Sequence, residues 1–587
     1  MADYVPPIED MRFLLSEVFD FDRQMAELYP DQGFDSALSV AVLEEAGRFC
    51  SEVLAPLNRP ADEEGCRLEN GHVSTPKGIA EAYRAFREAG WPAVSGEPEF
   101  GGQGLPRAVQ LLIDEMISAS NMSFGLFPGL THGAVEALSR HASPELKAAY
   151  LPKMISGEWT GVMALTEASA GTDLGLLKTQ AAPEGDGGYR ITGTKIFISS
   201  GDQDFGGNIV HLVLARLPDA PPGVKGISLF LVPKFLPGHN GEPRARNLVS
   251  VGALEHKMGI HAQPTCVMNY DGATGWLVGE PNRGLAAMFT MMNNERLFVG
   301  IQGLGLADGA YQKAAAYAKE RLQGRSADGA HGPVAIIEHP DVRRMLLAQR
   351  SFVEAGRALA VWTAMQMDIA ARHADPQARA DADGLVALLT PVVKAAFTDF
   401  GFESTVQAQQ VFGGHGYIRE WGVEQYVRDA RITQIYEGTN GVQAADLAGR
   451  KLAMEGGTLP ERFFALVAED LKSASQVEDA ARIARPVVMA LETLRETTRA
   501  LRSRATNPAE IGAAASDYLR LFALVALGWM WARIAMAAAA GEPGPRRSAR
   551  LDVARFFVDR MLPQTLGLAT SIGAGAGPVM ALDATAF

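Results

Sequence analysis

The chain has 587 residues, of which 47% are apolar and 21% charged, so it is globular in composition and long enough for several hydrophobic cores. Its 54 basic and 68 acidic residues give a net charge of −14 without a compensating basic run, which argues against nucleic acid as a partner. Cys50, Cys66 and Cys266 form no CxxC pair, so neither a disulfide framework nor a zinc site is expected. The N-terminus lacks the charge and apolar pattern of a secretion signal, and a reducing cytoplasm is the expected location.

The first 160 residues are predicted to be mainly helical. Residues 1–35 contain an amphipathic segment expected to be an N-terminal docking arm, and residues 36–160 are expected to form a helical domain. Helical spacing of apolar residues recurs over 36–49, 78–89, 108–118 and 133–138. Between the last two runs, apolar side chains alternate with glycines, which fits the wall of an apolar ligand pocket or ordinary core packing equally well. These side chains are Phe124, Leu126, Phe127 and Leu130.

At Gly161 the period changes from helix-like to alternating, which predicts a β domain over residues 161–281. Strands are expected within 160–165, 189–200, 208–217, 226–235 and 266–278. After Pro281 the helical pattern returns, and residues 282–456 are expected to form a helical bundle. Its helices are expected at 284–325, 340–372 and 385–411, the last two separated by a polar loop.

Residues 457–587 show further helical patterns and are expected to form an additional helical domain. Within it, residues 521–540 approach the length of a membrane span, but Arg533 lies past their middle. A central arginine costs about 2.5–3.5 kcal/mol on insertion scales. A buried helix of a bundle is therefore expected, with interfacial membrane contact as the alternative.

One carboxylate is a candidate general base. Glu437 lies between Tyr436 and Gly438, where its surroundings could desolvate it and raise its proton affinity. Thr439 and Asn440 favour a helix start directly after it, which would present free backbone N–H groups. The alternative is a structural glutamate at a helix junction. Upstream, the glycines of VFGGHGY would let a bulky charged ligand approach the backbone.

Together these segments, QVFGGHGYIREWGVEQYVRDARITQIYEGTNG, resemble the closing segment of the flavin-dependent acyl-CoA dehydrogenases. MALTEASAGTD resembles the first flavin signature of that family, KIFISSG the second, and EFGGQG its EYGGxG turn. Ala168 stands where a proline is usual, Thr172 where a serine is usual, and Phe197 where several members carry tryptophan. The resemblance implies an α+β, mainly α fold: an N-terminal helical domain, a β domain, a four-helix bundle and an additional C-terminal helical domain.

The resemblance also assigns roles to individual residues. Glu437 would be the catalytic base. Arg321 would supply positive charge for the flavin pyrophosphate, and an insertion at 326–337 follows it. The residues implied to hold FAD are Met163, Leu165, Thr166, Phe197, Ser199, Arg321, Gln410, Gly414, Thr439 and Gly441. Those implied to contact the acyl-CoA substrate are Thr172, Asn293, Arg296 and Gly438.

The implied activity is FAD-dependent α,β-dehydrogenation of an acyl-CoA thioester to a trans-2-enoyl-CoA, with electrons passed to electron-transferring flavoprotein, as in β-oxidation. The substrate would be a fatty acyl-CoA or 3-methylthiopropionyl-CoA, because long members with these extensions include methylthiopropionyl-CoA and bacterial fatty acyl-CoA dehydrogenases. The alternatives are an acyl-CoA oxidase that uses oxygen and a non-catalytic CoA-binding scaffold. A homodimer is expected, with Arg321 and Gln410 completing the flavin site of the neighbouring subunit and the additional domain covering the face that pairs dimers into tetramers.

Overall fold

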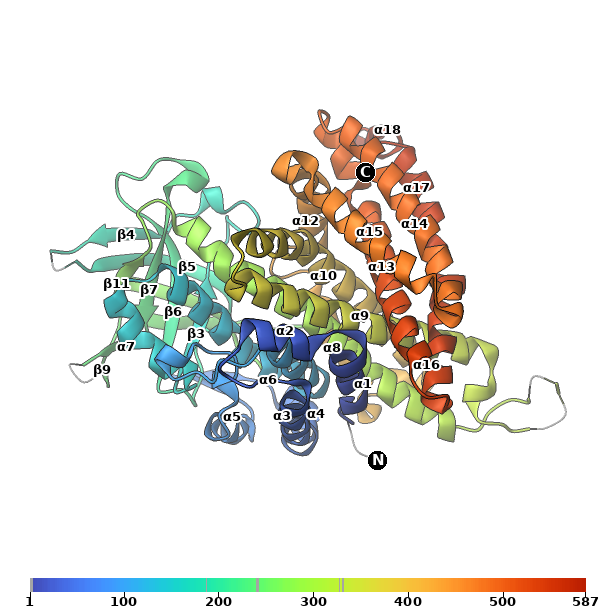
Figure 1. Cartoon of the computed structure of the whole chain (residues 1–587). Coiled ribbons are helices and arrows are strands. Elements are labelled where there is room, and N and C mark those ends of the chain that lie inside the picture. Colours follow the sequence, from blue (N-terminus) through green and yellow to red (C-terminus); the bar gives the residue numbers. More distant parts are fainter. Residues whose placement is uncertain (1–3, 186, 239–241, 327, 330–331) are drawn as a thin grey trace. The chain divides into compact units, whose positions relative to one another are not determined.

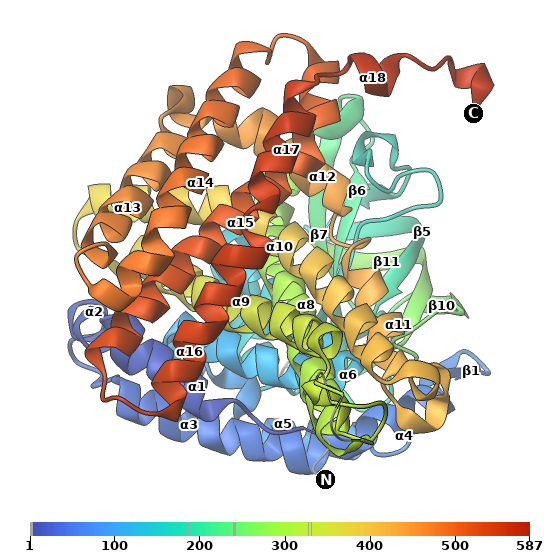
Figure 2. The same cartoon turned by 90° about the vertical axis from the view of Figure 1, so that its right-hand side faces the viewer.

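The computed structural model describes residues 4–587 except 186, 239–241, 327 and 330–331. Contacts between Cα atoms group the chain into two compact units (Figures 1 and 2). We call Arg48–Leu105 and Ser120–Phe298 the sheet unit, and Met1–Gly47, Pro106–Ala119 and Val299–Phe587 the helical unit. The expected α+β, mainly helical fold class, with extra helices at the C-terminal end, is confirmed.

The described part of the sheet unit is built on a sheet of seven strands. In this sheet β7 pairs with both β6 and β11. The strands β6 and β11 are also connected through β4 and β5, because β6 pairs with β4, β4 with β5, and β5 with β11. These pairings close five of the strands into a ring, and β3 and β10 extend it. The strands are β3 (Trp159–Ala164), β4 (Gln180–Pro183), β5 (Tyr189–Ser199), β6 (Asn208–Arg216), β7 (Ile227–Pro233), β10 (Val249–Leu254) and β11 (Thr265–Val278). Shorter pairs are β1 (Arg67–Glu69) with β2 (His72–Ser74), and β8 (Phe235–Pro237) with β9 (Pro243–Arg246).

The five expected strands are confirmed as β3, β5, β6, β7 and β11, whereas β4, which has only four residues, and β10 were not predicted. The helices that lie wholly in this unit are α4 (Ala55–Glu64), α5 (Ile79–Glu88) and α7 (Pro144–Ile155).

The long helical element α6 (Arg107–His141) consists of two helices that meet at a kink, so the expected pair of helices is confirmed and only the second one begins earlier than expected. The kink lies at Asn121, whose backbone is non-helical and whose Oδ1 accepts a hydrogen bond from the Phe124 N–H at 3.1 Å. This side chain restarts the helix, as an N-cap does. The apolar side chains that follow lie in the core, which supports the core-packing interpretation: Phe124, Leu126, Phe127 and Leu130 are buried.

The helical unit contains the remaining helices, with α9 packed along α10 (Figure 1). The expectation of a polar loop at 375–384 was wrong, because α10 already begins at Pro376. Asp375 caps that helix by accepting the Gln377 N–H at 2.9 Å, and Pro376 occupies its first turn. The helices are α1 (Ile8–Phe13), α2 (Phe21–Leu28), α3 (Ser36–Phe49), α8 (Gly284–Glu320), α9 (Pro340–Arg372), α10 (Pro376–Val411), α11 (Glu424–Thr433) and α12 (Asn440–Ala445). Of these, α3 and α8 belong to the helical unit only in part, because residues 48–49 and 284–298 fall in the sheet unit.

The C-terminal helices pack around α15, and Figure 2 shows α14 and α17 beside it. They are α13 (Leu459–Ala474), α14 (Glu478–Ser503), α15 (Pro508–Ala540), α16 (Pro545–Phe556) and α17 (Gln564–Gly573). The short α18 (Gly577–Met580) follows them and projects away from this group in Figure 2. In the described chain, α10 and α15 are long and apolar enough to cross a membrane, but 78% and 83% of their most apolar stretches lie buried. Arg533 of α15 pairs with Asp470 at 2.7 Å, so its charge is compensated inside the protein.

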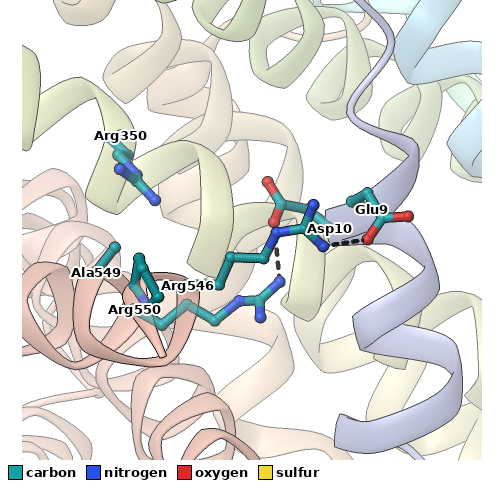
Figure 3. A pocket seen from close by; sticks show the side chains of 7 residues that line it. Glu9, Asp10, Arg350, Arg546, Ala549 and Arg550 are labelled. Atoms are coloured by element: carbon teal, nitrogen blue, oxygen red, sulfur yellow. Dashed lines mark hydrogen bonds and ion pairs between the residues drawn. The ribbon is translucent and has the colours of Figure 1, made fainter. Parts of the chain in front are cut away.

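The N-terminal helix α1 contacts α16 through salt bridges (Figure 3). Arg550 Nη2 lies 3.1 Å from Asp10 Oδ1, and its guanidinium covers the Phe13 ring. Arg546 pairs with Glu9. These side chains surround a pocket of about 270 Å³, whose charges are largely satisfied within the protein. The lining is Glu9, Asp10, Arg350, Pro545, Arg546, Ala549 and Arg550.

Candidate active site

The turn between α11 and α12 carries the predicted base in a strained backbone conformation. Glu437 has φ +56° and Gly438 has φ +82°. The left-handed region is rare for residues with a side chain, and such a conformation costs about 1–3 kcal/mol. A Cβ on Gly438 would lie 2.7 Å from Gln443 Nε2, so glycine is required there. We call Tyr436 to Asn440 the base turn.

Two buried side chains that the sequence did not single out hold the carbonyl groups of this turn. Gln443 Nε2 donates to the Glu437 carbonyl at 3.1 Å, and Lys394 Nζ donates to the Gly438 carbonyl at 2.8 Å. Thr439 caps α12 by accepting the Val442 N–H, as its residue type predicted. Gln443 lies in α12, directly after the turn, so the motif that contains Glu437 also contains Gln443. Lys394 lies in α10 and is far from this motif in sequence.

The glycine segment after α10 forms a second predicted part of the site. Gly414 is exposed and has open space where a side chain would project, and Gln410 is exposed as well. Gly416 has the opposite role, since a Cβ there would lie 2.3 Å from the Gln409 carbonyl oxygen. Gln409 also donates to the Gly416 carbonyl at 3.0 Å, so this neighbour of Gln410 shapes the loop.

The end of α8 is joined to that glycine segment by aromatic side chains. Tyr317 stacks on Phe412 at 4.2 Å, and its hydroxyl lies 2.9 Å from His415 Nδ1. Arg321 follows Tyr317 by about one helical turn, is exposed, and forms no ion pair with the residues that the structure describes. The Arg321 carbonyl accepts the Ile336 N–H at 2.8 Å, which anchors the far end of the insertion. Residues 327 and 330–331 of that insertion lie outside the described residues.

In the sheet unit, Phe197 occupies a β-bulge. β5 and β11 pair Ile198 with Cys266 and Lys195 with Met268, so two residues of β5 face one of β11 between these pairs. Phe197 has φ +59°, and its side chain is 59% exposed. An exposed aromatic ring held in a strained conformation is a candidate flat surface for a ligand.

A buried ion pair between Lys195 and Glu167 lies next to this bulge. Lys195 is fully buried, and its Nζ donates to Glu167 Oε1 at 2.9 Å and to the Leu165 carbonyl at 2.8 Å. Glu167 also accepts the Thr179 hydroxyl at 2.6 Å. Burial lowers the pKa of Lys195 to about 8, against the effect of the Glu167 charge. Burial opposes ionisation of Glu167, but Lys195 and Thr179 outweigh it and lower the pKa of Glu167.

The predicted flavin residues of this unit gather around the same place. The Thr166 carbonyl accepts the Ile196 N–H at 2.9 Å, which joins the end of β3 to β5. Met163 and Leu165 precede this junction, and Ser199 follows it on β5. Thr172 lies further along, on an exposed loop, so it stands apart from them in the chain.

The two residues expected to contact CoA on α8 are neighbours. Arg296 Nη1 donates to Asn293 Oδ1 at 3.3 Å, and the Arg296 guanidinium faces the Phe289 ring at 6.0 Å. Asn293 is exposed, whereas Arg296 is largely buried.

Comparison with known proteins covers almost the whole chain. Models of the acyl-CoA dehydrogenase N-terminal, middle and C-terminal domains match residues 37–158, 162–273 and 282–452, and an acetyl-CoA dehydrogenase C-terminal like model matches 463–583. The chain is 44% identical to 3-methylmercaptopropionyl-CoA dehydrogenase of Ruegeria pomeroyi, over 95% of this chain and 96% of that one. It is 32% identical to the broad-specificity linear acyl-CoA dehydrogenase FadE5 of Mycobacterium tuberculosis, over 100% of both.

A solved structure shows the same fold. Caenorhabditis elegans ACDH-11, in complex with C11-CoA, superposes with a TM-score of 0.78 at 21% identity, over 94% of this chain and 91% of that one. The sequence relatives and the domain matches agree with the resemblance seen in the motifs. The chain therefore belongs to the acyl-CoA dehydrogenase family.

Proposed function

We propose that this acyl-CoA dehydrogenase uses Glu437 to remove the α proton of its thioester substrate. The observation that carries the proposal is the base turn, where a carboxylate residue is held in the left-handed region by side chains that bond to the carbonyls of Glu437 and Gly438. Such strain persists where the surroundings determine it, and it concentrates at functional sites.

The reaction requires two things of the chain's own residues. A carboxylate must accept the α proton, and a donor must stabilise the charge that develops on the thioester oxygen. Glu437 offers both, through its side chain and its backbone N–H. With its carbonyl oxygen fixed by Gln443, the peptide plane after Glu437 keeps a constant orientation, which favours repeated placement of the carboxylate.

FAD is the cofactor of this family, and when bound it supplies the acceptor for the hydride that leaves the β carbon. The residues present fit a flavin. Phe197 offers an exposed ring, Gly414 leaves open space for close approach, and Arg321 is an exposed cation suited to pyrophosphate. The residues proposed to hold FAD are Met163, Leu165, Thr166, Phe197, Ser199, Arg321, Gln410, Gly414, Thr439 and Gly441.

For the substrate, Thr172, Asn293, Arg296 and Gly438 are proposed to contact the acyl-CoA. The relative from Ruegeria pomeroyi is named for a short methylthio acyl group, and FadE5 is named for linear acyl chains. We therefore propose 3-methylthiopropionyl-CoA or a linear fatty acyl-CoA as the substrate. Electron-transferring flavoprotein is the proposed acceptor.

The proposed assembly is a homodimer in the cytoplasm. Arg321 and Gln410 are both exposed in the single chain. Residues that complete the flavin site of a second subunit have to be exposed before the two subunits associate. The free cysteines Cys50, Cys66 and Cys266 fit a reducing compartment. Light scattering after size exclusion would give the mass of two chains, and a mass of four chains would contradict the dimer.

A panel of acyl-CoAs tests the activity. The FAD-loaded enzyme is mixed anaerobically with each substrate, and the trans-2-enoyl-CoA product is quantified before and after addition of electron-transferring flavoprotein or air. The proposal predicts sustained turnover with the flavoprotein and little with air. Rapid turnover with oxygen alone would indicate an oxidase, and no product with any acyl-CoA would indicate a scaffold.

A further inference from the structure

The base turn is held by a lysine from a different helix. Lys394 lies in the middle of α10 and is fully buried. Its Nζ donates to the Gly438 carbonyl at 2.8 Å and to Asn440 Oδ1 at 2.9 Å, so it spans the residues directly after Glu437. A buried ammonium group is costly unless its hydrogen bonds are satisfied. Its placement against a main-chain carbonyl and an amide therefore indicates a specific role for this turn.

Asn440 is the second member of this arrangement. While its Oδ1 accepts from Lys394, its Nδ2 donates to Thr398 Oγ1 at 2.9 Å and to Asp399 Oδ1 at 2.7 Å. Asp399 Oδ1 also accepts from Gln434 Nε2 at 2.7 Å, on the other side of the turn. The chain is thus tied to α10 both before the base turn, at Gln434, and at its end, at Asn440. Lys394, Thr398 and Asp399 are four and five residues apart, which places them on adjacent turns of that helix.

The C-terminal helices reinforce the same part of α10. α15 packs against both α10 and α12. Arg520 of α15 forms two bonds with Glu403, at 2.6 Å and 3.1 Å, and its guanidinium covers the Phe400 ring at 4.6 Å. The helix that carries Lys394 is therefore also held by α15, one helical turn beyond Asp399.

We propose that Lys394 is a positioning residue for the reaction: by holding the Gly438 carbonyl and Asn440, it keeps the Glu437 carboxylate where the α proton can be taken. This inference rests on the proposed function of Glu437. Lys394 acts through the backbone of the turn and takes no proton itself. A misplacement of about 1 Å can cost about 100-fold in rate, so the loss of this contact should reduce the rate of proton removal more than substrate binding.

The test is Lys394→Met in the FAD-loaded enzyme, because methionine keeps most of the apolar stem and removes the donor. We expect kcat to fall by about 10- to 100-fold with KM changed by less than about threefold. With substrate deuterated at the α carbon, the isotope effect on kcat should exceed that of the wild type, because proton removal becomes more rate-limiting. A purely structural lysine would not change the isotope effect.

Two further variants keep the result interpretable. Lys451→Met removes another buried lysine of the helical unit and should leave the isotope effect at its wild-type value. If Lys394→Met does not retain FAD, Asn440→Ala replaces it, and a smaller fall in kcat with the same rise in the isotope effect is expected. A wild-type kcat and isotope effect in the folded variant would overturn the proposal.

Glu437→Gln separates this proposal from the proposed function. If Glu437→Gln turns over normally, Glu437 is not the base, and the role of Lys394 falls with it. If Glu437→Gln is inactive while Lys394→Met behaves as the wild type, only the positioning role is wrong.

Discussion

The base turn and the bulge in β5 both contain a residue with a left-handed backbone, but different contacts hold the two segments. Each presents one side chain with a proposed function from a left-handed backbone, Glu437 at φ +56° and Phe197 at φ +59°. At the base turn, side chains donate directly to the main-chain carbonyls of the strained segment. At the bulge, strand pairing with β11 fixes the backbone, and the Lys195–Glu167 ion pair holds the neighbouring strand end.

This difference predicts whether a substitution at each segment mainly lowers protein stability or mainly lowers turnover. The bulge depends on two opposite buried charges, so removing one leaves the other uncompensated and should strongly destabilise the sheet unit. The base turn depends on several hydrogen bonds to neutral groups, each of modest net strength, so a single loss should disturb geometry before it disturbs folding. Stability should therefore respond most strongly at the bulge, and turnover at the turn.

The largest stability effect is expected for Glu167→Gln. It leaves the buried Lys195 ammonium without its carboxylate and should cost about 3–5 kcal/mol in urea unfolding. The pKa of Glu167 is lowered in the fold, so the stability of the pair is present above the ordinary value of 4.5 and is lost as pH falls through the lower folded value. The wild-type advantage over the variant should shrink in that acidic range.

Glu184→Gln is the matched control, because Glu184 pairs with Arg190 on the surface of the same unit. That exchange should cost less than about 1 kcal/mol. Equal losses in the two variants would contradict a special role for the buried pair.

An intermediate effect is expected for Phe197→Ala. Loss of the exposed ring should weaken FAD binding by about tenfold or less, since an aromatic pair contributes about 0.5–1.5 kcal/mol beyond its area burial. Fluorescence titration of the apoprotein measures the change. Phe197→Trp should keep wild-type affinity, and Leu248→Ala, at another exposed apolar residue of the sheet unit, should have no effect. An unchanged affinity in Phe197→Ala would remove the ring from the flavin site.

The smallest effect is expected for Asp399→Asn, which should change turnover by less than about threefold because an acceptor oxygen remains for the amides around it. Burial raises the pKa of Asp399, with Gln434 and Asn440 opposing. The folded state therefore holds this proton more tightly than the unfolded state does, and wild-type stability falls as pH rises from 3.8 through the folded value. The variant should escape this fall. Parallel pH curves for the two proteins in thermal unfolding would contradict the assignment.

Periodicity predicted the long elements well and the short ones poorly. The run of 208–217 is almost continuously apolar and became β6, whereas β4 has only four residues and pairs within a sheet that sequence alone does not position. The segment after Asp375 looked like a loop because it is polar, yet Asp375 and Pro376 are strong helix-start residues. Capping chemistry was the better guide there.

The motifs predicted roles for Glu437, Phe197 and Gly414, and these roles stay predictions. The motifs could not point to Lys394, because its contact with the base turn joins residues 44 apart in the chain. The strain at Glu437 was equally invisible, since backbone angles depend on contacts that no local pattern records. The expected division into arm, four domains and their boundaries stays a prediction.

The central claim is that Glu437 takes the α proton, and Glu437→Gln tests it most directly. The FAD-loaded variant is mixed anaerobically with an acyl-CoA that the wild type oxidises, and the visible absorption of the flavin is followed. The amide keeps the shape of the side chain but cannot accept the proton, so we predict unchanged acyl-CoA binding and flavin reduction slower by about 10²- to 10⁴-fold. Reduction at a rate close to that of the wild type would contradict the account.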